Sequence, residues 1–423
     1  MNNKKVESKQ ILAAVVGNAL EWYDFVIFGF FTVVISKIFF PSENEINSLL
    51  IAMATFGVGF FMRPIGGIFI GIYADSLGRK AALQLIIFLM TISLVLIVIT
   101  PSYETVGIIA PIIIVFARLM QGFATGGEFA SATSFLVESA PFQKRGFYGS
   151  LQMVGQSIAV LTGATFGFLI TQFLEPNQVN SWGWRVPFIF GLLIAPVGFY
   201  IRRNLNETDS FLKGKKLEKK IKIIDLWFEN KKSLLVSFGL VVSGTIMFYV
   251  VLIYMPTYAK LQLNIPLNQA FIAQVIGLVF LTLGIPIFGT LSDRLGRRKI
   301  LLFASFMYLC LPFPLMYWLN SDPSLLKLII MQTILCSTIS IGFGAISTAL
   351  AEQFTVRVRS TGLAIGYNFA VMIFGGFAQF IVTWLINYTN NPLAPSFYVM
   401  FGAIVGITSS LFMIDNFKDK NFN

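Results

Sequence analysis

Histidine is absent from this 423-residue chain, and cysteine occurs only at Cys310 and Cys336. Without histidine, the chain lacks the side chain that most readily gains and loses a proton near neutral pH, so any proton chemistry must use carboxylates. Both cysteines sit inside apolar runs, where small core residues are expected rather than a disulfide framework or a metal site. Redox chemistry and a metal centre are therefore not predicted.

Charge is also scarce. Asp, Glu, Lys and Arg make up 12% of the residues, whereas apolar residues make up 56% and the mean hydropathy is +0.76. Because a soluble domain carries roughly a quarter charged residues, the chain is predicted to be an integral membrane protein. Its net charge of +11 could suggest a nucleic-acid partner, but the cations gather at the two ends and in alternate loops. That asymmetry is typical of cytoplasmic loops, so it predicts two cytoplasmic termini and no nucleic-acid binding.

Two charged strings stand half a chain apart and share one pattern. Residues 71–80 and 289–298 both begin with Gly and continue to Asp, Leu, Gly and Arg at the same spacing. Internal repeats of this kind, in which each half supplies one side of a central site, are the usual construction of secondary transporters. The chain is therefore predicted to be a duplicated membrane bundle.

A membrane-spanning helix needs about 20 mostly apolar residues. The sequence predicts twelve such helices and so an all-α membrane fold of two pseudo-symmetric six-helix bundles. The predicted spans are 11–40, 46–74, 81–100, 106–137, 146–174, 186–203, 234–262, 269–292, 299–320, 325–351, 361–388 and 396–414. The bundles would occupy residues 1–203 and 234–423, joined by a lysine-rich cytoplasmic linker at 204–233. Its segment 223–228 is either an interfacial helix on anionic headgroups or part of a basic loop.

A second repeat adds charges at the cytoplasmic helix ends. Glu138 precedes Arg145 by seven residues, and Glu352 precedes Arg359 by the same spacing. Membrane topology alone would explain the basic residues, but it does not explain acids that recur beside them. We expect latches of charge-assisted hydrogen bonds that close the cytoplasmic side in one state and break in the other. The predicted gating residues are Asp75, Arg79, Glu138, Arg145, Asp293, Arg297, Glu352 and Arg359.

Glu21 and Asp24 are acids inside the first predicted span. A charge at the bilayer centre costs roughly 2.5–3.5 kcal/mol or more, so such a residue is a functional candidate by default. The two acids are three residues apart and share a helix face, where repulsion and burial should keep at least one of them protonated near neutral pH. They are the predicted proton carriers, together with Glu128 in the fourth span. The alternative is a static ion pair between one acid and Arg118 or Arg63.

Arg118 and Gln121 lie on one stripe of the fourth predicted span. A guanidinium can hold a carboxylate through two parallel hydrogen bonds, and the glycines that follow allow a helix or a ligand to approach closely. The competing interpretation is a glycine packing motif with a structural arginine. Arg63 stands before Pro64, which can loosen the helix backbone, and is a candidate for either gating or solute contact.

The C-terminal half carries no comparable charge inside its predicted spans. It offers hydrogen-bonding side chains instead, of which Tyr249, Tyr254 and Asn368 are predicted solute contacts. Aromatic packing is the competing interpretation for each tyrosine. We therefore expect the first half to handle charge and protons and the second half to provide shape and hydrogen bonds.

The paired strings resemble the signature loops of the major facilitator superfamily, although Ser76 departs from the basic residue usual after the aspartate. Within that superfamily, the sequence resembles the metabolite:proton symporter family, which includes bacterial proline/betaine, citrate and 2-oxoglutarate permeases. The stretches that carry this resemblance are 17–25, 62–67, 121–122, 126–128, 144–147 and 182–188. The resemblance implies proton symport across a bacterial cytoplasmic (inner) membrane.

The predicted function is proton-coupled uptake of a small polar organic solute by alternating access. Two intramembrane arginines, and the lack of the heptad tail that some osmosensing betaine permeases add, favour a carboxylate metabolite over a proline/betaine-type osmolyte. A proton-driven exporter fits the same fold, a membrane sensor is disfavoured, and an enzyme is least favoured because the sequence shows no catalytic constellation. We expect the proton gradient to drive transport without a cofactor, and the unit to be a monomer in the lipid bilayer.

Overall fold

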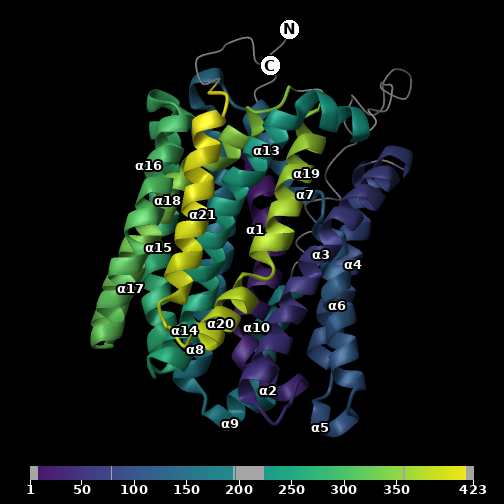
Figure 1. Ribbon diagram of the computed structural model, residues 1–423. Helices are drawn as coiled ribbons and strands as arrows, with labels where there is room; N and C mark the ends of the chain where they lie inside the picture. Colours follow the sequence, from purple (N-terminus) through teal and green to yellow (C-terminus); the bar gives the residue numbers. More distant parts are fainter. Residues whose placement is uncertain (1–7, 78, 194–195, 197–222, 356–357, 416–423) are drawn as a thin grey trace.

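The computed structural model describes residues 8–77, 79–193, 196, 223–355 and 358–415. Every regular element in these ranges is helical, which confirms the predicted all-α class. Most of the helices run roughly along one direction (Figure 1). Such an arrangement satisfies the backbone polar groups of apolar segments within each helix. The start of α1 (Ser8–Phe30) and the end of α21 (Ala394–Phe412) lie at the same end of the bundle.

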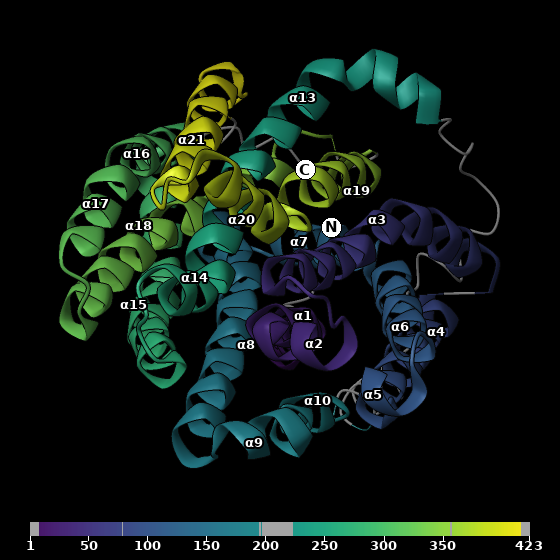
Figure 2. The ribbon, with the colours of Figure 1, turned by 60° about the horizontal axis from the view of Figure 1, so that its bottom comes forward.

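In the described residues, the first half of the chain contains ten α-helices. They are α1, α2 (Thr32–Phe39), α3 (Glu45–Leu77), α4 (Arg79–Ile99), α5 (Tyr103–Val106), α6 (Ile109–Thr125), α7 (Glu128–Glu138), α8 (Arg145–Phe173), α9 (Pro176–Gln178) and α10 (Arg185–Gly191). Figure 2 shows α1 near the middle of this half, with α3, α8 and α10 around it.

The second half contains nine α-helices and two π-helical segments in the described residues. They are α13 (Ile223–Met247), η3 (Phe248–Tyr254), α14 (Met255–Gln262), α15 (Leu267–Leu295), α16 (Arg297–Cys310), α17 (Pro312–Ser321), α18 (Leu325–Ala351), α19 (Arg359–Ala370), η4 (Val371–Gly375), α20 (Ala378–Thr389) and α21. The π segments are η3 and η4. Both interrupt predicted spans next to the other half, and π-bulges often occur at functional positions.

Eleven of the twelve predicted spans are recognisable in the described part of the chain. Nine helices, some including a break, are long and apolar enough to cross a membrane, and α1 with α2 forms a further span bent by 64°. The third span has a shorter apolar helix, Gln84–Ile99. The sixth begins as α10, and most of its remainder lies outside the described residues, as does most of the predicted linker. α13 begins at Ile223 and is kinked at Asn230.

The sequence predicts the fourth span, 106–137, as one apolar run. In the structure, this span consists of two helices, α6 and α7, separated at Gly126 and Gly127. Close packing against α3 explains the composition there, because a Cβ atom at Gly126 would lie 2.0 Å from the carbonyl oxygen of Arg63. At Gly122, a Cβ atom would lie 1.6 Å from the carbonyl oxygen of Gly59. The glycines therefore allow two backbones to touch, which is the packing role considered for this stretch.

The two halves meet along several helix pairs. In particular, α8 packs along α15, α7 packs against α19, and α3 packs against α19 and α20. In addition, α1 contacts η3 and α7 contacts α18. Side chains from both halves can therefore line one shared space.

Candidate functional site

A small cavity of about 40 Å³ lies between the two halves. Side chains of α1, α7 and α8 line it from the first half, and side chains of α13, η3, α18, α19 and η4 line it from the second. Six of the lining residues are aromatic, namely Trp22, Phe129, Phe248, Tyr249, Phe343 and Tyr367. A cavity of this size has room for a few water molecules, so the space is contracted in this structure.

Arg118 is fully buried on α6 with its guanidinium against phenylalanine rings. Its Nη1 donates a hydrogen bond of 2.6 Å to Oε1 of Gln121, on the predicted stripe. Its Cζ lies 4.7 Å from the ring centres of Phe25 and Phe28. Neither Nε nor Nη2 has a hydrogen-bond partner among the described residues. Because unpaired buried donors cost free energy, this guanidinium can gain from an anionic ligand with two acceptor atoms.

Arg63 lies in the same aromatic layer. Its Cζ is 4.5 Å from the ring centres of Phe25 and Phe60 and 5.2 Å from that of Trp22. Phe25 therefore contacts both guanidinium groups, and Arg63 and Arg118 interact electrostatically with each other. Two cations held this close create a region of positive potential beside the cavity.

Tyr367 of α19 connects this layer to the second half of the chain. Its hydroxyl group is in polar contact with the side chains of Arg63 and Gln156, and it lies within electrostatic range of Glu21. Its ring stacks on that of Phe129, with 3.7 Å between the ring centres and 7° between the planes. Gln156 and Phe129 are not among the residues predicted from the sequence. The signal for Gln156 is an amide inside the apolar fifth span.

Asp24 and Glu21 are both buried on α1, but they meet different neighbours. Neither carboxyl oxygen of Asp24 has a hydrogen-bond partner in the described part of the chain. Oδ1 of Asp24 lies 2.6 Å from the place that a Cβ atom at Gly191 of α10 would occupy. Arg118 attracts Asp24 electrostatically, whereas Glu21 interacts with Tyr367. A hydrogen-bonded static pair between Asp24 and an arginine is therefore not formed in this structure.

Glu128 begins α7 directly after the glycine break, and its Oε1 lies near Gly17 of α1. Tyr249 lines the cavity, and its hydroxyl group has no hydrogen-bond partner within the described ranges. Tyr249 also interacts electrostatically with Arg63 and Arg118. The structure therefore brings one predicted residue of the second half to the charged layer of the first.

The other two predicted solute contacts of the second half, Asn368 and Tyr254, are not part of the cavity lining, and neither are Arg118, Arg63 and Gln121. Nδ2 of Asn368 donates a hydrogen bond of 2.6 Å to the carbonyl oxygen of Gly126 at the break of the fourth span. Oγ1 of Thr383 on α20 donates a hydrogen bond of 3.1 Å to Oη of Tyr254 and also contacts Sδ of Met53 on α3. In this structure both side chains therefore join helices to one another on either side of the cavity.

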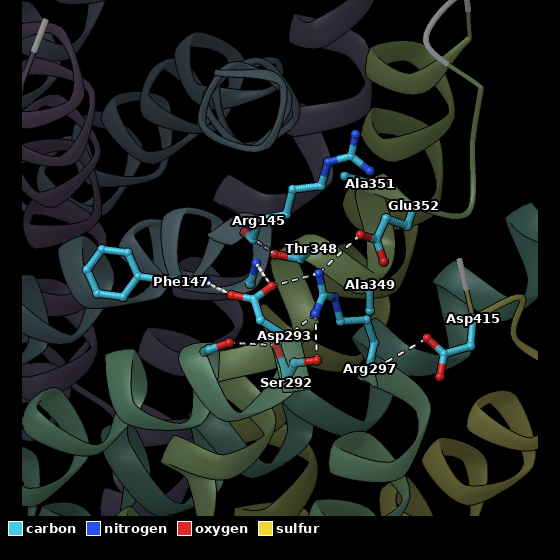
Figure 3. A network of polar contacts seen from close by, with 12 residues as sticks. Arg145, Phe147, Ser292, Asp293, Arg297, Thr348, Ala349, Ala351, Glu352 and Asp415 are labelled. Carbon is cyan, nitrogen blue, oxygen red and sulfur yellow. Dashed lines mark hydrogen bonds and ion pairs between the residues drawn. The ribbon is translucent and has the colours of Figure 1, made fainter. Parts of the chain in front are cut away.

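A polar network joins the halves near the end of the bundle where α15 ends and α8 begins (Figure 3). Oδ1 and Oδ2 of Asp293 accept hydrogen bonds of 2.7 and 3.0 Å from the backbone N–H groups of Gly146 and Phe147. These are two of the N–H groups that the first turn of α8 leaves unpaired, and an acid is stabilised there. Arg297 forms ion pairs with Asp293 at 3.0 Å and with Glu352 at 3.3 Å.

A second group of contacts extends this network. Arg359 of α19 forms an ion pair of 2.8 Å with Glu138 at the end of α7. Oγ1 of Thr348 donates a hydrogen bond of 3.0 Å to the carbonyl oxygen of Arg145. Burial raises the pKa of Glu352 above its usual value, although Arg297 acts in the opposite direction. Of the predicted gating residues, Glu138 and Arg359 thus form an ion pair across the halves and Asp293 binds the start of α8, whereas both ion-pair partners of Arg297 lie in its own half.

The side chains of Asp75 and Arg79 lie outside the described part of the molecule, so the first copy of the repeated string is placed only by its backbone. Asp293 lies within the last turn of α15 rather than in a loop, and the turn comes at Gly296, whose φ of 96° favours glycine. Among the described residues, no group of His, Cys, Asp and Glu could hold a metal ion.

The model of the Major Facilitator Superfamily matches residues 14–379. The chain belongs to this superfamily. Its members are transporters rather than enzymes, and the predicted twelve-helix architecture and membrane class agree with this membership.

Two curated relatives of this superfamily member are similar over nearly its whole length. The citrate-proton symporter of Klebsiella pneumoniae is 34% identical over 403 residues, which cover 95% of this chain and 91% of the relative. The proline/betaine transporter of Escherichia coli (strain K12) is also 34% identical, over 420 residues that cover 96% of this chain and 83% of the relative. These relatives carry different solutes at equal identity, so identity alone does not choose between them.

The fold has solved counterparts as well. The xylose transporter XylE from E. coli, in a partially occluded inward open conformation, matches with a TM-score of 0.73 and covers 96% of both chains. Its sequence identity is 17%, so the likeness shows the fold alone.

Proposed function

We propose that this superfamily member is a proton-coupled symporter that imports a small organic solute carrying a carboxylate group. The observation that carries the proposal is the buried guanidinium of Arg118. Its Nε and Nη2 have no hydrogen-bond partner in the described residues, and neither have the carboxyl oxygens of Asp24. The relatives named as proton symporters and solute transporters support the same direction of coupling.

In this mechanism the proton is carried by acids of the first half, and no cofactor takes part. Asp24 is the principal proton site, and Glu21 and Glu128 assist it at the contacts of α1 with α7 and α19. The carboxylate of the solute binds Arg118, with Arg63, Gln121 and Tyr249 as further contacts. Binding an anion beside two arginines makes the ionised form of Asp24 less favourable, which couples solute loading to proton loading.

Asn368 and Tyr254 bind the solute only when the contacts that now engage them have opened. In this structure they hold α19 to the break of the fourth span and α20 to η3. The gating residues Asp293, Arg297, Glu352, Arg359, Glu138 and Arg145, with Asp75 and Arg79 of the first repeat, hold the cytoplasmic side shut. Residues 1–203 and 234–423 would rock against each other as two bundles around the linker 204–233.

The protein would act as a monomer in the bacterial cytoplasmic membrane, with both termini in the cytoplasm. The start of α1 and the end of α21 share the end of the bundle that carries the charged network. In the sequence, lysine and arginine are concentrated near both termini, in alternate loops and in the linker, as cytoplasmic segments require.

A second candidate is a zwitterionic osmolyte of the proline/betaine type. The lining of the cavity favours it, because it contains six aromatic side chains. Of these, Trp22 contacts Arg63, and Tyr249 interacts electrostatically with Arg63 and Arg118. Aromatic faces bind quaternary ammonium groups, while an arginine would hold the carboxylate of the same molecule. An exporter of amphipathic compounds would instead need a larger apolar cavity in its open states.

Uptake by proteoliposomes under an imposed pH gradient tests the function directly. The solutes should include citrate, 2-oxoglutarate, other small acids, proline and betaine, each with an acidic exterior and with no gradient. Accumulation that needs the acidic exterior supports proton symport, and the solute that accumulates separates the two classes. Solute loss from the vesicles under the same gradient would show export instead.

A further inference from the structure

We propose that α10 forms one wall of the proton site, and that Gly191 and Tyr23 position the carboxyl group of Asp24 within it. The proposal rests on the proposed proton coupling through Asp24. It gives a role to the stretch 182–188, none of whose residues lines the solute cavity.

Gly191, the last residue of α10, packs against the carboxyl group of Asp24. A Cβ atom there would lie 2.6 Å from Oδ1 of Asp24, 3.5 Å from Cδ1 of Leu94 on α4 and 3.6 Å from Cε1 of Tyr23. Real Cβ atoms do not approach oxygen this closely, so any larger residue would displace the carboxyl group. Only glycine lets α10 close this corner without moving Asp24.

Tyr23 holds α10 against α1 one residue before the acid. Its Oη donates a hydrogen bond of 2.9 Å to the carbonyl oxygen of Pro187 in α10. Its ring also meets that of Phe190 edge to face, with 5.4 Å between ring centres. Because Tyr23 and Asp24 are adjacent in the chain, the position of α10 is transmitted to the carboxyl group.

Arg185 fixes the other end of α10 to α4. Its Nε donates a hydrogen bond of 2.9 Å to the carbonyl oxygen of Val98, and its Nη2 donates one of 3.1 Å to that of Thr100. Its guanidinium also lies over the ring of Trp184, at 4.5 Å from the ring centre. The residues of the stretch 182–188 therefore set α10 as a wall between α4 and α1.

The corner formed by α1, α4 and α10 is closed to solvent at Asp24. Asp24 is 1% exposed and does not line the cavity. The groups that act on it electrostatically are Arg118 from α6 and Tyr23 from α1 itself. α10 and α4 present Gly191 and Leu94, which cannot titrate. At a buried position without hydrogen-bond partners, the protonated carboxyl group is more stable than the ionised one. A movement of α10 would therefore change the balance between the two forms.

The test compares Gly191→Ala and Tyr23→Phe with the wild-type chain in proteoliposomes. Ile189→Ala, on the exposed side of α10, is the matched control. Gradient-driven uptake of labelled citrate is measured over a range of external pH, with betaine as the probe if citrate is not transported. Counterflow of the same solute without a gradient reports binding and conformational exchange separately.

We expect Gly191→Ala to shift the pH of half-maximal uptake by about one unit, and Tyr23→Phe to shift it in the same direction by less. Counterflow should stay at the wild-type rate in both variants. Ile189→Ala should show the wild-type pH profile and the wild-type rate of counterflow. In an Asp24→Asn background, Gly191→Ala should change neither counterflow nor its pH dependence, because the group it positions no longer titrates.

Unchanged pH profiles in both variants would overturn the positioning role. A loss of counterflow with an unshifted pH profile would also overturn it, because that result indicates only a packing defect. If Gly191→Ala does not reach the membrane, Tyr23→Phe decides alone, because it removes one hydroxyl group and keeps the ring. Failure of the proposed function is distinct, since wild-type protein would then show no gradient-driven uptake of any solute.

Discussion

Phe25 explains how two arginines can lie close together inside a membrane protein. Its ring contacts the guanidinium groups of both Arg63 and Arg118. The negative face of an aromatic ring stabilises a cation without forming hydrogen bonds. The Nε and Nη2 groups of Arg118 therefore stay available while its charge is partly compensated. A carboxylate partner would occupy them.

Asp24 should be essential for energised transport but not for solute exchange. We expect Asp24→Asn to abolish accumulation driven by a pH gradient while counterflow persists, because Asn has the shape of a protonated Asp but cannot release a proton. Glu21→Gln should reduce accumulation less, since Glu21 lies near Tyr367 rather than at the unpaired position. If both variants accumulate solute normally, neither acid carries the coupled proton.

Arg118 should hold the solute by its planar group rather than by its charge alone. Arg118→Lys keeps the charge but loses the two-point contact, so solute affinity should fall by about 1.5–3 kcal/mol, the value of a hydrogen bond to a charged group. Arg118→Gln should weaken binding further. Competition binding with purified protein measures both, and a solute that binds wild type and variants equally would exclude Arg118 from the site.

At the scale of whole elements, the interruptions of the helices decide where side chains can meet. The fourth span breaks at Gly126 and Gly127, and Asn368 of α19 satisfies the carbonyl oxygen of Gly126. In the seventh span, the π segment η3 carries Tyr249 to the cavity and Tyr254 to α20. Such interruptions break the regular hydrogen-bond ladder, so they are natural places for a helix to bend during transport.

The end of α15 should control the cytoplasmic closure through Asp293. In Asp293→Asn the side chain can accept at one oxygen only and no longer carries the charge that favours the N-terminus of α8. We expect cysteines placed near the cytoplasmic end of the cavity to react faster with a membrane-impermeant thiol reagent. Asp75→Asn, at the equivalent position of the first repeat, should act in the same direction if both strings are latches. An unchanged labelling pattern in both would leave membrane topology as their only role.

At the scale of the whole molecule, both ends of the cavity are closed by contacts between the halves. Asp293 and Arg359 contact the first half at the end of the bundle where α15 ends, and Phe271 meets Phe30 and Phe31 toward the other end. The contacts on one side must break for the halves to rock. The cavity of about 40 Å³ between them is smaller than a site that holds an organic solute.

The ion pair between Glu138 and Arg359 offers a test of this rocking. Glu138→Arg or Arg359→Glu alone should weaken the cytoplasmic closure by placing like charges together. The double exchange should restore it, because the two side chains keep their positions with the charges reversed. Thiol labelling on the cytoplasmic side measures each variant. A double variant that labels as fast as the single ones would show that the pair does not hold the closed state.

The sequence alone determined the membrane class, the superfamily and most of the spans, because long apolar runs and a repeated charged string depend on residue order only. It also singled out Arg118, Asp24 and Asp293, since a charge in or beside an apolar run is visible without coordinates. It could not show that Glu138 pairs with Arg359, because that contact joins residues more than two hundred positions apart.

The tertiary structure decided which of these residues meet, and around what. It placed Asn368 and Tyr254 in contacts between helices. It brought Gln156 and Phe129 to Tyr367. It also placed Asp24 against Gly191, outside the cavity. In a membrane helix nearly every face is apolar, so hydrophobic periodicity does not reveal which face turns inward. Helix packing at glycines, and breaks such as that at Gly126, fix those directions only when the whole bundle has assembled.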